Sequence, residues 1–289
     1  MKKILYLPLL LLVFSCTEET ITDTDEKMVD STGIKERATT TQKIFYTIPS
    51  PVETGMIFQK AGAEYRKELL NPIENISNYT VQNEQAINLG VYGADLSYVN
   101  IFDQTQEALF YLNGAKKLAD QLGVLNAFDE SSLERMEENI NIRDSVMTII
   151  SDSYWKVDTY LKSVGQEHLS ALVVAGGWIE GLYIGTQMNA LTQDKPLSKK
   201  IADQKHSLNN LIALLNIYKN NEEVNRIKNK LLDLKTAYDK IVETEGEVEI
   251  TTVDSIKTSI IDSSIELKFT DEIIMEITEK IKQIRNEII

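Results

Sequence analysis

The residues best suited to chemistry lie in one apolar segment near the middle of the chain. Residues 169–188 have the sequence LSALVVAGGWIEGLYIGTQM, in which Glu180 is the only carboxylate and lies between Trp178 and Tyr183. A carboxylate in an apolar helix is costly unless it is paired or faces a cleft, where it can act as an acid or base. Glu180 is therefore the best single candidate for a ligand-binding residue, with Trp178 and Tyr183 beside it. The structural alternative is that Glu180 faces solvent, or satisfies a neighbouring helix end or a tyrosine hydroxyl.

A second polar group surrounds a predicted junction between two helices near residue 100. Its members are tyrosines, carboxylates and one amide: Tyr92, Asp95, Tyr98, Asp103, Gln104 and Glu107. Carboxylates beside a phenol can do acid-base work, whereas acidic residues at helix starts more often act as caps and dipole partners. Tyr92 and Asp95 join the candidate ligand-binding residues. A hydrolase-like enzyme that uses Glu180, or Asp95 with Asp103 and Glu107, is the catalytic alternative.

Metal and cofactor chemistry has little support in the sequence. The two histidines, His168 and His206, have no partner at the HExxH spacing, and no 12-residue loop has the acidic spacing of an EF-hand. The glycine pair at 176–177 lies in an apolar helical segment and does not follow a strand, unlike a dinucleotide fingerprint. We therefore expect no metal and no cofactor.

The only cysteine, Cys16, follows a segment typical of secretion. Lys2 and Lys3 precede a short apolar run at 4–14, which is well below the ~20 residues that a membrane span needs. The sequence Val-Phe-Ser-Cys at 13–16 resembles a bacterial lipobox. This resemblance implies that residues 1–15 are a lipoprotein signal peptide, and that Cys16 becomes the lipidated first residue, carrying palmitate or similar chains.

The residues after Cys16 predict a disordered acidic tether over 16–43. They are rich in Thr, Asp and Glu, and they contain too few large apolar residues to offset the entropy of ordering. The sequence Thr-Glu-Glu-Thr at 17–20 resembles the acidic tag that sends some Gram-negative lipoproteins to the cell surface. This resemblance favours a surface-exposed location in the outer membrane over a periplasm-facing one; a solvated tether without an address is the alternative.

Composition predicts one folded domain over 44–289. The 289 residues are 43% hydrophobic and 26% charged, which is typical of an ordinary globular protein. The formal net charge of −14 argues against nucleic acid as a partner, because such binding depends on neutralising phosphates. The membrane, reached through the lipid on Cys16, is the expected partner.

Helical periodicity covers almost all of this domain. Apolar residues recur at spacings of three and four, and the chain has only 13 glycines and 5 prolines. The predicted helices span 52–70, 80–99, 104–122, 144–161, 167–190, 198–219 and 221–242, with a final helix carrying the isoleucines of 273–288. Short links between helices favour antiparallel neighbours. We therefore predict an all-α fold, a multi-helix antiparallel bundle of about eight helices.

Three glycines single out the apolar segment as the centre of that bundle. Gly177, Gly181 and Gly185 recur every four residues and share one helical face. Glycine costs about 0.8–1 kcal/mol at an interior helical position, so this repeat predicts the close approach of another backbone. We predict a central helix packed on several sides.

Only one stretch of the domain breaks the helical pattern. Residues 243–249 are acidic, contain Gly246 and predict a loop. The β-branched residues of 248–253 favour a short strand. Because no partner strand can be identified, irregular structure is predicted there.

As a whole, the chain resembles the all-helical lipoproteins of Gram-negative bacteria. The segments NLGVYGADL at 88–96 and AGGWIEG at 175–181 carry the resemblance, which extends over 44–289. It implies no activity. We expect a membrane-anchored lipoprotein that acts as a non-catalytic binding or scaffolding module of the cell envelope and engages an envelope protein or an extracellular ligand. The alternatives are the hydrolase-like enzyme with a pocket around Glu180 and a purely structural role.

Overall fold

The computed structural model describes residues 64–127, 134–135, 137–253 and 258–289. All of them belong to one unit of the chain, Thr39–Ile289. The predicted signal peptide, Cys16, the tether and positions 52–63 of the first predicted helix lie outside the described residues.

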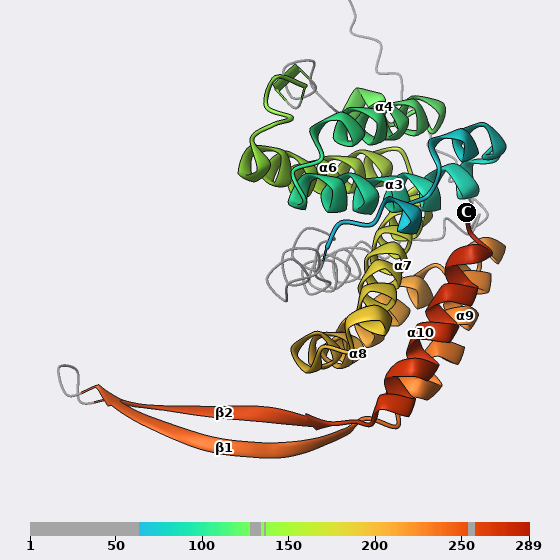
Figure 1. Ribbon diagram of the computed structural model, residues 1–289. Helices are drawn as coiled ribbons and strands as arrows, with labels where there is room; N and C mark the ends of the chain where they lie inside the picture. Colours follow the sequence, from blue (N-terminus) through green and yellow to red (C-terminus); the bar gives the residue numbers. More distant parts are fainter. Residues whose placement is uncertain (1–63, 128–133, 136, 254–257) are drawn as a thin grey trace, which may run out of the picture. The chain divides into compact units, whose positions relative to one another are not determined.

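Helices make up most of the described chain, so the predicted all-α bundle of about eight helices is confirmed (Figure 1). The long helices are α3 (Gln82–Ile101), α4 (Thr105–Gln121), α6 (Arg143–Ser163), α7 (Glu167–Thr192), α8 (Lys195–Ile217), α9 (Glu222–Tyr238) and α10 (Asp271–Asn286). Residues 134, 135, 137 and 138 are also helical. Three short 3-10 helices complete the helical elements: η1 (Lys67–Leu69), η2 (Ile73–Asn78) and η3 (Leu125–Ala127).

Local sequence explains where several of these helices begin and end. The side chains of Asp194 and Asn221 each accept a hydrogen bond from the backbone N–H three residues later, and so cap α8 and α9 at 3.0 Å. Pro196 lies in the first turn of α8, where its missing N–H costs nothing. Gly123 and Gly165 take positive φ angles of 77° and 72° just beyond α4 and α6, a conformation that other residues disfavour.

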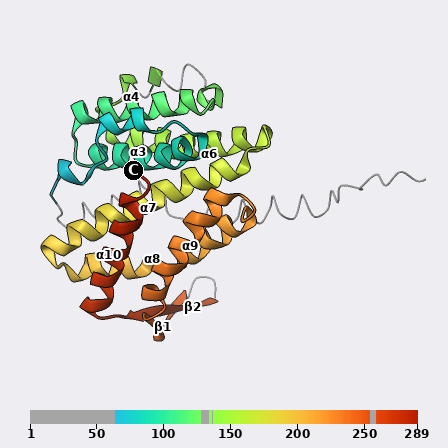
Figure 2. The same ribbon diagram turned by 90° about the vertical axis from the view of Figure 1, so that its right-hand side faces the viewer.

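Helix α7 is the centre of the bundle, as predicted. It contacts α3, α6, α8, α9 and α10, and passes between the group formed by α3, α4 and α6 and the group formed by α8, α9 and α10 (Figures 1 and 2). Among the described helices, α7 alone is long and apolar enough to cross a membrane, but its apolar window is entirely buried inside the fold. Nearly every residue from Leu169 to Asn189 is buried, which explains why its sequence is apolar all round.

A second backbone approaches closely where α7 crosses α3, but the glycine of α7 that this approach requires is Gly176, which lies off the predicted face of Gly177, Gly181 and Gly185. A Cβ on Gly176 would lie 1.8 Å from the carbonyl oxygen of Ile87, and a Cβ on Gly90 would lie 2.0 Å from that of Val173 and 2.7 Å from the nitrogen of Gly177. Glycine is therefore required on both helices, because any side chain would push the two backbones apart.

Residues 64–70 do not form the predicted helix. The backbone N–H of Arg66 donates to the Tyr98 hydroxyl at 2.8 Å, and that of Asn71 donates to Oδ2 of Asp95 at 3.2 Å. Only the single turn η1 forms before the chain extends through Pro72 into η2. The prediction was wrong here because side chains of α3 take the backbone donors that a helix would have used internally.

The stretch predicted to be irregular forms an antiparallel β-hairpin instead. Strand β1 (Val242–Val253) pairs with β2 (Thr258–Lys268), with Val242 opposite Lys268, Val253 opposite Thr258 and a bulge between Glu245 and Val248. The predicted loop at 243–249 is therefore part of a strand. At the base of the hairpin, Lys205 of α8 forms an ion pair with Glu243 at 3.0 Å and donates to the carbonyl of Ile241 at 2.8 Å.

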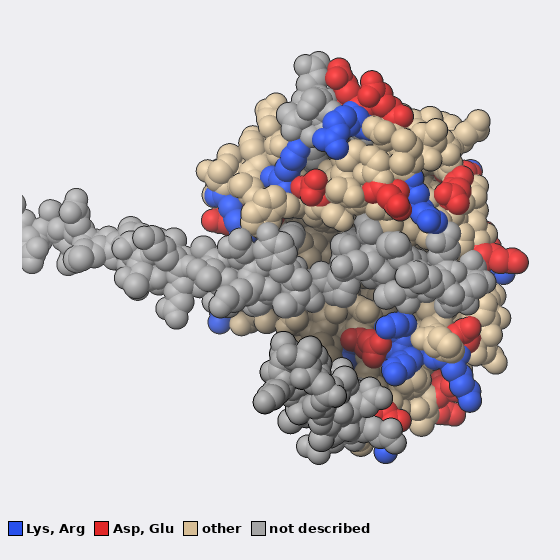
Figure 3. Space-filling model, turned by 90° about the vertical axis from the view of Figure 1, so that its left-hand side faces the viewer, with Lys and Arg blue, Asp and Glu red and all other residues tan. Residues whose placement is uncertain are grey.

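Charged side chains of both signs are interspersed on the face shown in Figure 3. Across the described surface, several charged side chains form exposed ion pairs, such as Lys67 with Glu107 and Lys280 with Asp233. Exposed pairs of this kind contribute little to stability. On this face acidic and basic side chains lie near one another.

Candidate functional site

Glu180 lies in the core of the bundle and is bound on both oxygens by one arginine. The guanidinium of Arg285, on α10, donates from Nε to Oε2 at 3.0 Å and from Nη2 to Oε1 at 3.1 Å. The same Nη2 donates to the carbonyl of Leu69 at 3.1 Å, and the guanidinium lies 4.6 Å from the ring centroid of Tyr183. Glu180 has no exposed surface and Arg285 is 6% exposed. Glu180 and Arg285 therefore form a buried, bidentate ion pair, and Arg285 also makes a cation–π contact with Tyr183.

Asp95 of α3 completes the cluster. Its Oδ2 accepts from the backbone N–H of Asn71, and its carboxyl lies beside that of Glu180, close enough for each to affect the pKa of the other. Its Oδ1 is buried and has no hydrogen-bond partner among the described residues. Two carboxyl groups can share a hydrogen bond only when one of them carries a proton.

The proton is best placed on Asp95. Complete burial raises the pKa of Asp95 well above its usual value of 3.8, and the neighbouring charge of Glu180 raises it further. Burial raises the pKa of Glu180 as well, but the guanidinium of Arg285 and the hydrogen bond from Asp95 oppose that effect. We assign a neutral Asp95 that donates to an ionised Glu180, which in turn neutralises Arg285.

A shell of amides and tyrosines ties the segment before α3 to this cluster. The side chain of Asn71 donates to the Tyr79 hydroxyl at 2.9 Å, and the Tyr111 hydroxyl of α4 donates to the Asn71 carbonyl at 3.1 Å. Asn88 of α3 donates to the carbonyl of Ile288 at 2.8 Å. The network therefore joins the segment before α3 to the helices α3, α4, α7 and α10 and to Ile288 near the C-terminus.

Three of the five predicted ligand-binding residues come together here. The carboxyl groups of Glu180 and Asp95 lie beside each other, and Tyr183 lies against Arg285. Tyr92 lies nearby with its ring 6.5 Å from that of Tyr79, and its hydroxyl donates to the carbonyl of Pro72 at 2.6 Å. Trp178 is buried on α7, and its indole Nε1 has no hydrogen-bond partner within the described part of the chain.

Arg285 was not among the residues predicted from the sequence to form a site. A signal was present, because Arg285 follows Ile277 and Ile281 at a spacing of four and so falls beside the apolar stripe of the final helix. A cation on such a stripe requires a buried anion.

The predicted acidic group around residue 100 is divided in the structure. Glu107 forms a surface pair with Lys67 at 3.1 Å. Asp103 takes a φ of 55° just after α3, beside a small depression that Asn100 and Gln104 also line. Neither accompanies Asp95 into the core, so these carboxylates are not arranged around one substrate.

Asp95 predicts an unusual dependence of stability on pH. Because its pKa is raised in the folded state, the folded chain holds a proton that the unfolded chain releases above about pH 4. Asp95 should therefore contribute a fall in the free energy of unfolding as pH rises above that value, of up to about 1.4 kcal/mol per pH unit until its folded pKa is reached. Asp95→Asn should remove this slope, because the amide nitrogen donates to Glu180 without ionising. Urea denaturation at pH 4, 5, 6 and 7 measures the difference.

The control for this experiment is Asp120→Asn, which removes one carboxylate from an exposed position on α4. It should leave the slope of the wild-type curve unchanged. Parallel curves for the wild type and Asp95→Asn would show that no proton is held at this site.

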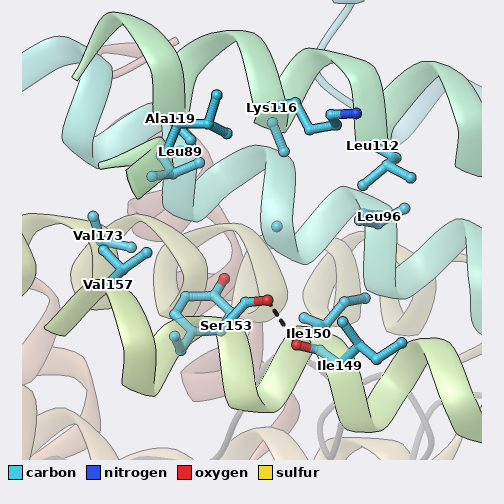
Figure 4. Close-up of a pocket in the computed structure, with 14 residues that line it drawn as sticks. Leu89, Leu96, Leu112, Lys116, Ala119, Ile149, Ile150, Ser153, Val157 and Val173 are labelled. Carbon is cyan, nitrogen blue, oxygen red and sulfur yellow. Dashed lines mark hydrogen bonds between the residues drawn. The ribbon is translucent and has the colours of Figure 1, made fainter. Parts of the chain in front are cut away.

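A second feature, an aliphatic cavity, lies between α3, α4 and α6 (Figure 4). Its volume is about 80 Å³. Leucines, isoleucines, valines and alanines form most of the lining, including Leu89, Leu96, Leu112, Ala119, Ile149 and Val157. Lys116 is the only charged residue among those that line it.

Neither feature is an arrangement for metal binding. No group of three His, Cys, Asp or Glu residues is placed to hold a metal ion within the ranges that the structure describes. The chain matches no protein-family model, and no curated protein or solved structure is significantly similar to it.

Proposed function

We propose that the protein is a lipid-anchored, non-catalytic binding module of the cell envelope, and that its helical domain takes an apolar ligand. The lipid on Cys16 would hold it in the outer membrane, with the surface-exposed side favoured by the acidic residues at 17–20. The observation that carries the binding role is the aliphatic cavity between α3, α4 and α6. Pockets that hold small molecules are concave and mostly apolar, with few polar groups.

The geometry of the buried cluster favours binding over hydrolysis. Glu180 has both oxygens committed to Arg285, and Asp95 has its carboxyl committed to Glu180 and Asn71. Both carboxyl groups are completely buried. General acid-base catalysis needs a group within hydrogen-bond reach of the substrate, and these side chains reach only protein atoms. The hydrolase alternative therefore gains no support from the cluster.

One experiment tests the anchor and the ligand together. The full chain is purified from the membrane fraction with a mild detergent and weighed by intact and native mass spectrometry. We expect a mass that starts at Cys16 and includes acyl chains, together with a non-covalent apolar compound that is lost on denaturation.

Two variants serve as controls for the two parts of that result. Cys16→Ser should abolish acylation and release the protein from the membrane. Ala115→Leu, which adds bulk to the wall of the cavity, should remove the bound compound and leave acylation intact. A wild-type chain that is neither acylated nor loaded would contradict the proposal.

A further inference from the structure

The segment at 66–72, here called the strap, precedes α3 and is bound through its backbone by side chains of other elements. The side chains that bind it are Tyr92, Asp95, Tyr98, Tyr111 and Arg285, on α3, α4 and α10. Within the strap, backbone hydrogen bonds run from Leu69 to Arg66 at 3.4 Å and from Leu70 to Lys67 at 3.1 Å. The position of the strap therefore depends on side chains of the helical bundle.

Two of the bonds that hold the strap come from the buried charged cluster. The backbone N–H of Asn71 donates to Oδ2 of Asp95 at 3.2 Å, and Nη2 of Arg285 donates to the carbonyl of Leu69 at 3.1 Å. Nη2 of Arg285 also donates to Glu180, so strap and carboxylate share one guanidinium. A change of charge in the cluster therefore acts directly on the atoms that fix the strap.

The closed cluster has room for one ionised carboxyl group. Both oxygens of Glu180 are bonded to Arg285, whereas Oδ1 of Asp95 is buried and has no hydrogen-bond partner among the described residues. Ionised Asp95 would place a second negative charge beside Glu180 and would leave that oxygen without a donor. Burial and the neighbouring Glu180 accordingly raise the pKa of Asp95 well above its usual value.

The titratable groups that face Asp95 come from every element packed around it. Glu180 on α7 and Arg285 on α10 carry charge, and the others are the tyrosines Tyr65, Tyr92, Tyr98, Tyr111, Tyr154 and Tyr183. Burial raises the pKa of each tyrosine above its usual value of 10.0, so all of them are neutral near pH 7. Arg285 is thus the cation that opposes a charge on Asp95, and Glu180 already uses it.

The strap is the part of these surroundings that costs least to displace. Helices α3 and α7 approach at backbone distance at Gly90 and Gly176, and α10 buries a row of isoleucines. In the strap only positions 69–71 are buried, while Lys67, Glu68 and Pro72 are exposed. Segments with few buried apolar contacts open locally at a lower free energy than the whole fold requires.

We propose that the strap is a pH-dependent lid, which stays closed while Asp95 is protonated and lifts from the cluster as Asp95 ionises. Lifting brings water to Asp95 and frees Arg285 from the carbonyl of Leu69. In the open form the pKa of Asp95 returns to about 4, and in the closed form it is raised. The opening equilibrium should therefore increase by up to ten-fold per pH unit between about pH 4 and the closed-state pKa. This device is independent of the proposed ligand and lipid anchor.

Hydrogen exchange of the full chain, followed by mass spectrometry from pH 5 to pH 8, tests the lid. After division by the intrinsic exchange rate, peptides that cover 66–72 should exchange up to ten-fold faster per pH unit. Peptides that cover 172–184 of α7 should exchange more slowly, and low concentrations of urea should accelerate them but not the strap. Equal corrected rates for strap and α7 at every pH would overturn the proposal, because the strap would then open only with the whole fold.

Three variants identify the group responsible. Asp95→Asn keeps an acceptor for the N–H of Asn71 but cannot ionise, so protection of the strap should no longer depend on pH. Glu107→Gln is the matched control, because it breaks the exposed ion pair with Lys67 of the strap and should leave the pH slope unchanged. Tyr98→Phe removes another bond to the strap, and should speed exchange equally at every pH. A slope that persists in Asp95→Asn, or disappears in Tyr98→Phe, would contradict the role of Asp95.

Discussion

Glu180→Gln is expected to lower the free energy of unfolding by about 3–5 kcal/mol, because it leaves a buried guanidinium without its carboxylate. In the wild type Arg285 donates twice to Glu180 at 3.0 and 3.1 Å and is almost completely buried. An amide can accept only one of those bonds and carries no charge. Urea denaturation at pH 7, followed by circular dichroism, gives the change in stability.

Two comparisons give that experiment its specificity. Lys280 lies on the same helix as Arg285, α10, and forms an exposed ion pair with Asp233 of α9. Lys280→Gln breaks that pair and should change stability by less than about 1 kcal/mol. The double variant Glu180→Met with Arg285→Met removes both charges together, and should cost less than Glu180→Gln alone. A loss below 1 kcal/mol in Glu180→Gln would mean that the ion pair is not the centre of the network.

Gly176→Ala is expected to destabilise the protein by about 3 kcal/mol, although alanine is the better helix former by about 1 kcal/mol. The new Cβ would lie 1.8 Å from the carbonyl oxygen of Ile87, so α3 and α7 would have to separate. Their separation would disturb the largest helix–helix contact in the fold and the cluster that bridges Asp95 and Glu180. Urea denaturation of the variant beside the wild type measures the loss.

Gly114→Ala is the matched control, because it makes the same substitution in a buried helical glycine. There the new Cβ would lie 2.7 Å from the terminal methyl of Ile76, which can move aside, and 3.4 and 3.5 Å from side-chain atoms of Ile73 and Tyr92, but would meet no backbone atom at such distances. We expect its stability to remain within about 1 kcal/mol of the wild type. Equal effects of the two substitutions would show that the crossing of α3 and α7 tolerates a wider separation.

The agreement between predicted and observed helices follows from the local nature of helical signals. The predicted 144–161, 167–190 and 198–219 correspond to α6, α7 and α8 to within three residues at each end. Apolar spacing, capping residues and turn glycines all act within a few positions along the chain, so the sequence alone contains them. The outcome for 64–70 was different, because Tyr98 and Asp95 bind the backbone of that segment from more than 20 residues away.

The hairpin was missed for a related reason. A strand is stabilised by its partner, and the β-branched residues of 248–253 say nothing about where that partner lies. In the structure β2 follows β1 after only four residues, 254–257, but the stretch from 258 to 268 mixes polar and apolar residues without the alternation that would mark it clearly. Its pairing with β1 therefore had no counterpart in the local pattern.

By itself, the sequence determined that this protein is helical, that α7 is its central helix and that Glu180 requires an explanation, because periodicity and the cost of a charge among apolar residues are properties of a short segment. Only the tertiary structure decided what satisfies Glu180. Asp95, Glu180 and Arg285 lie on α3, α7 and α10, far apart in the chain, and their contacts exist only when the three helices pack. The aliphatic cavity likewise belongs to no single element. It is the space left between α3, α4 and α6, and its width depends on how closely these helices approach one another.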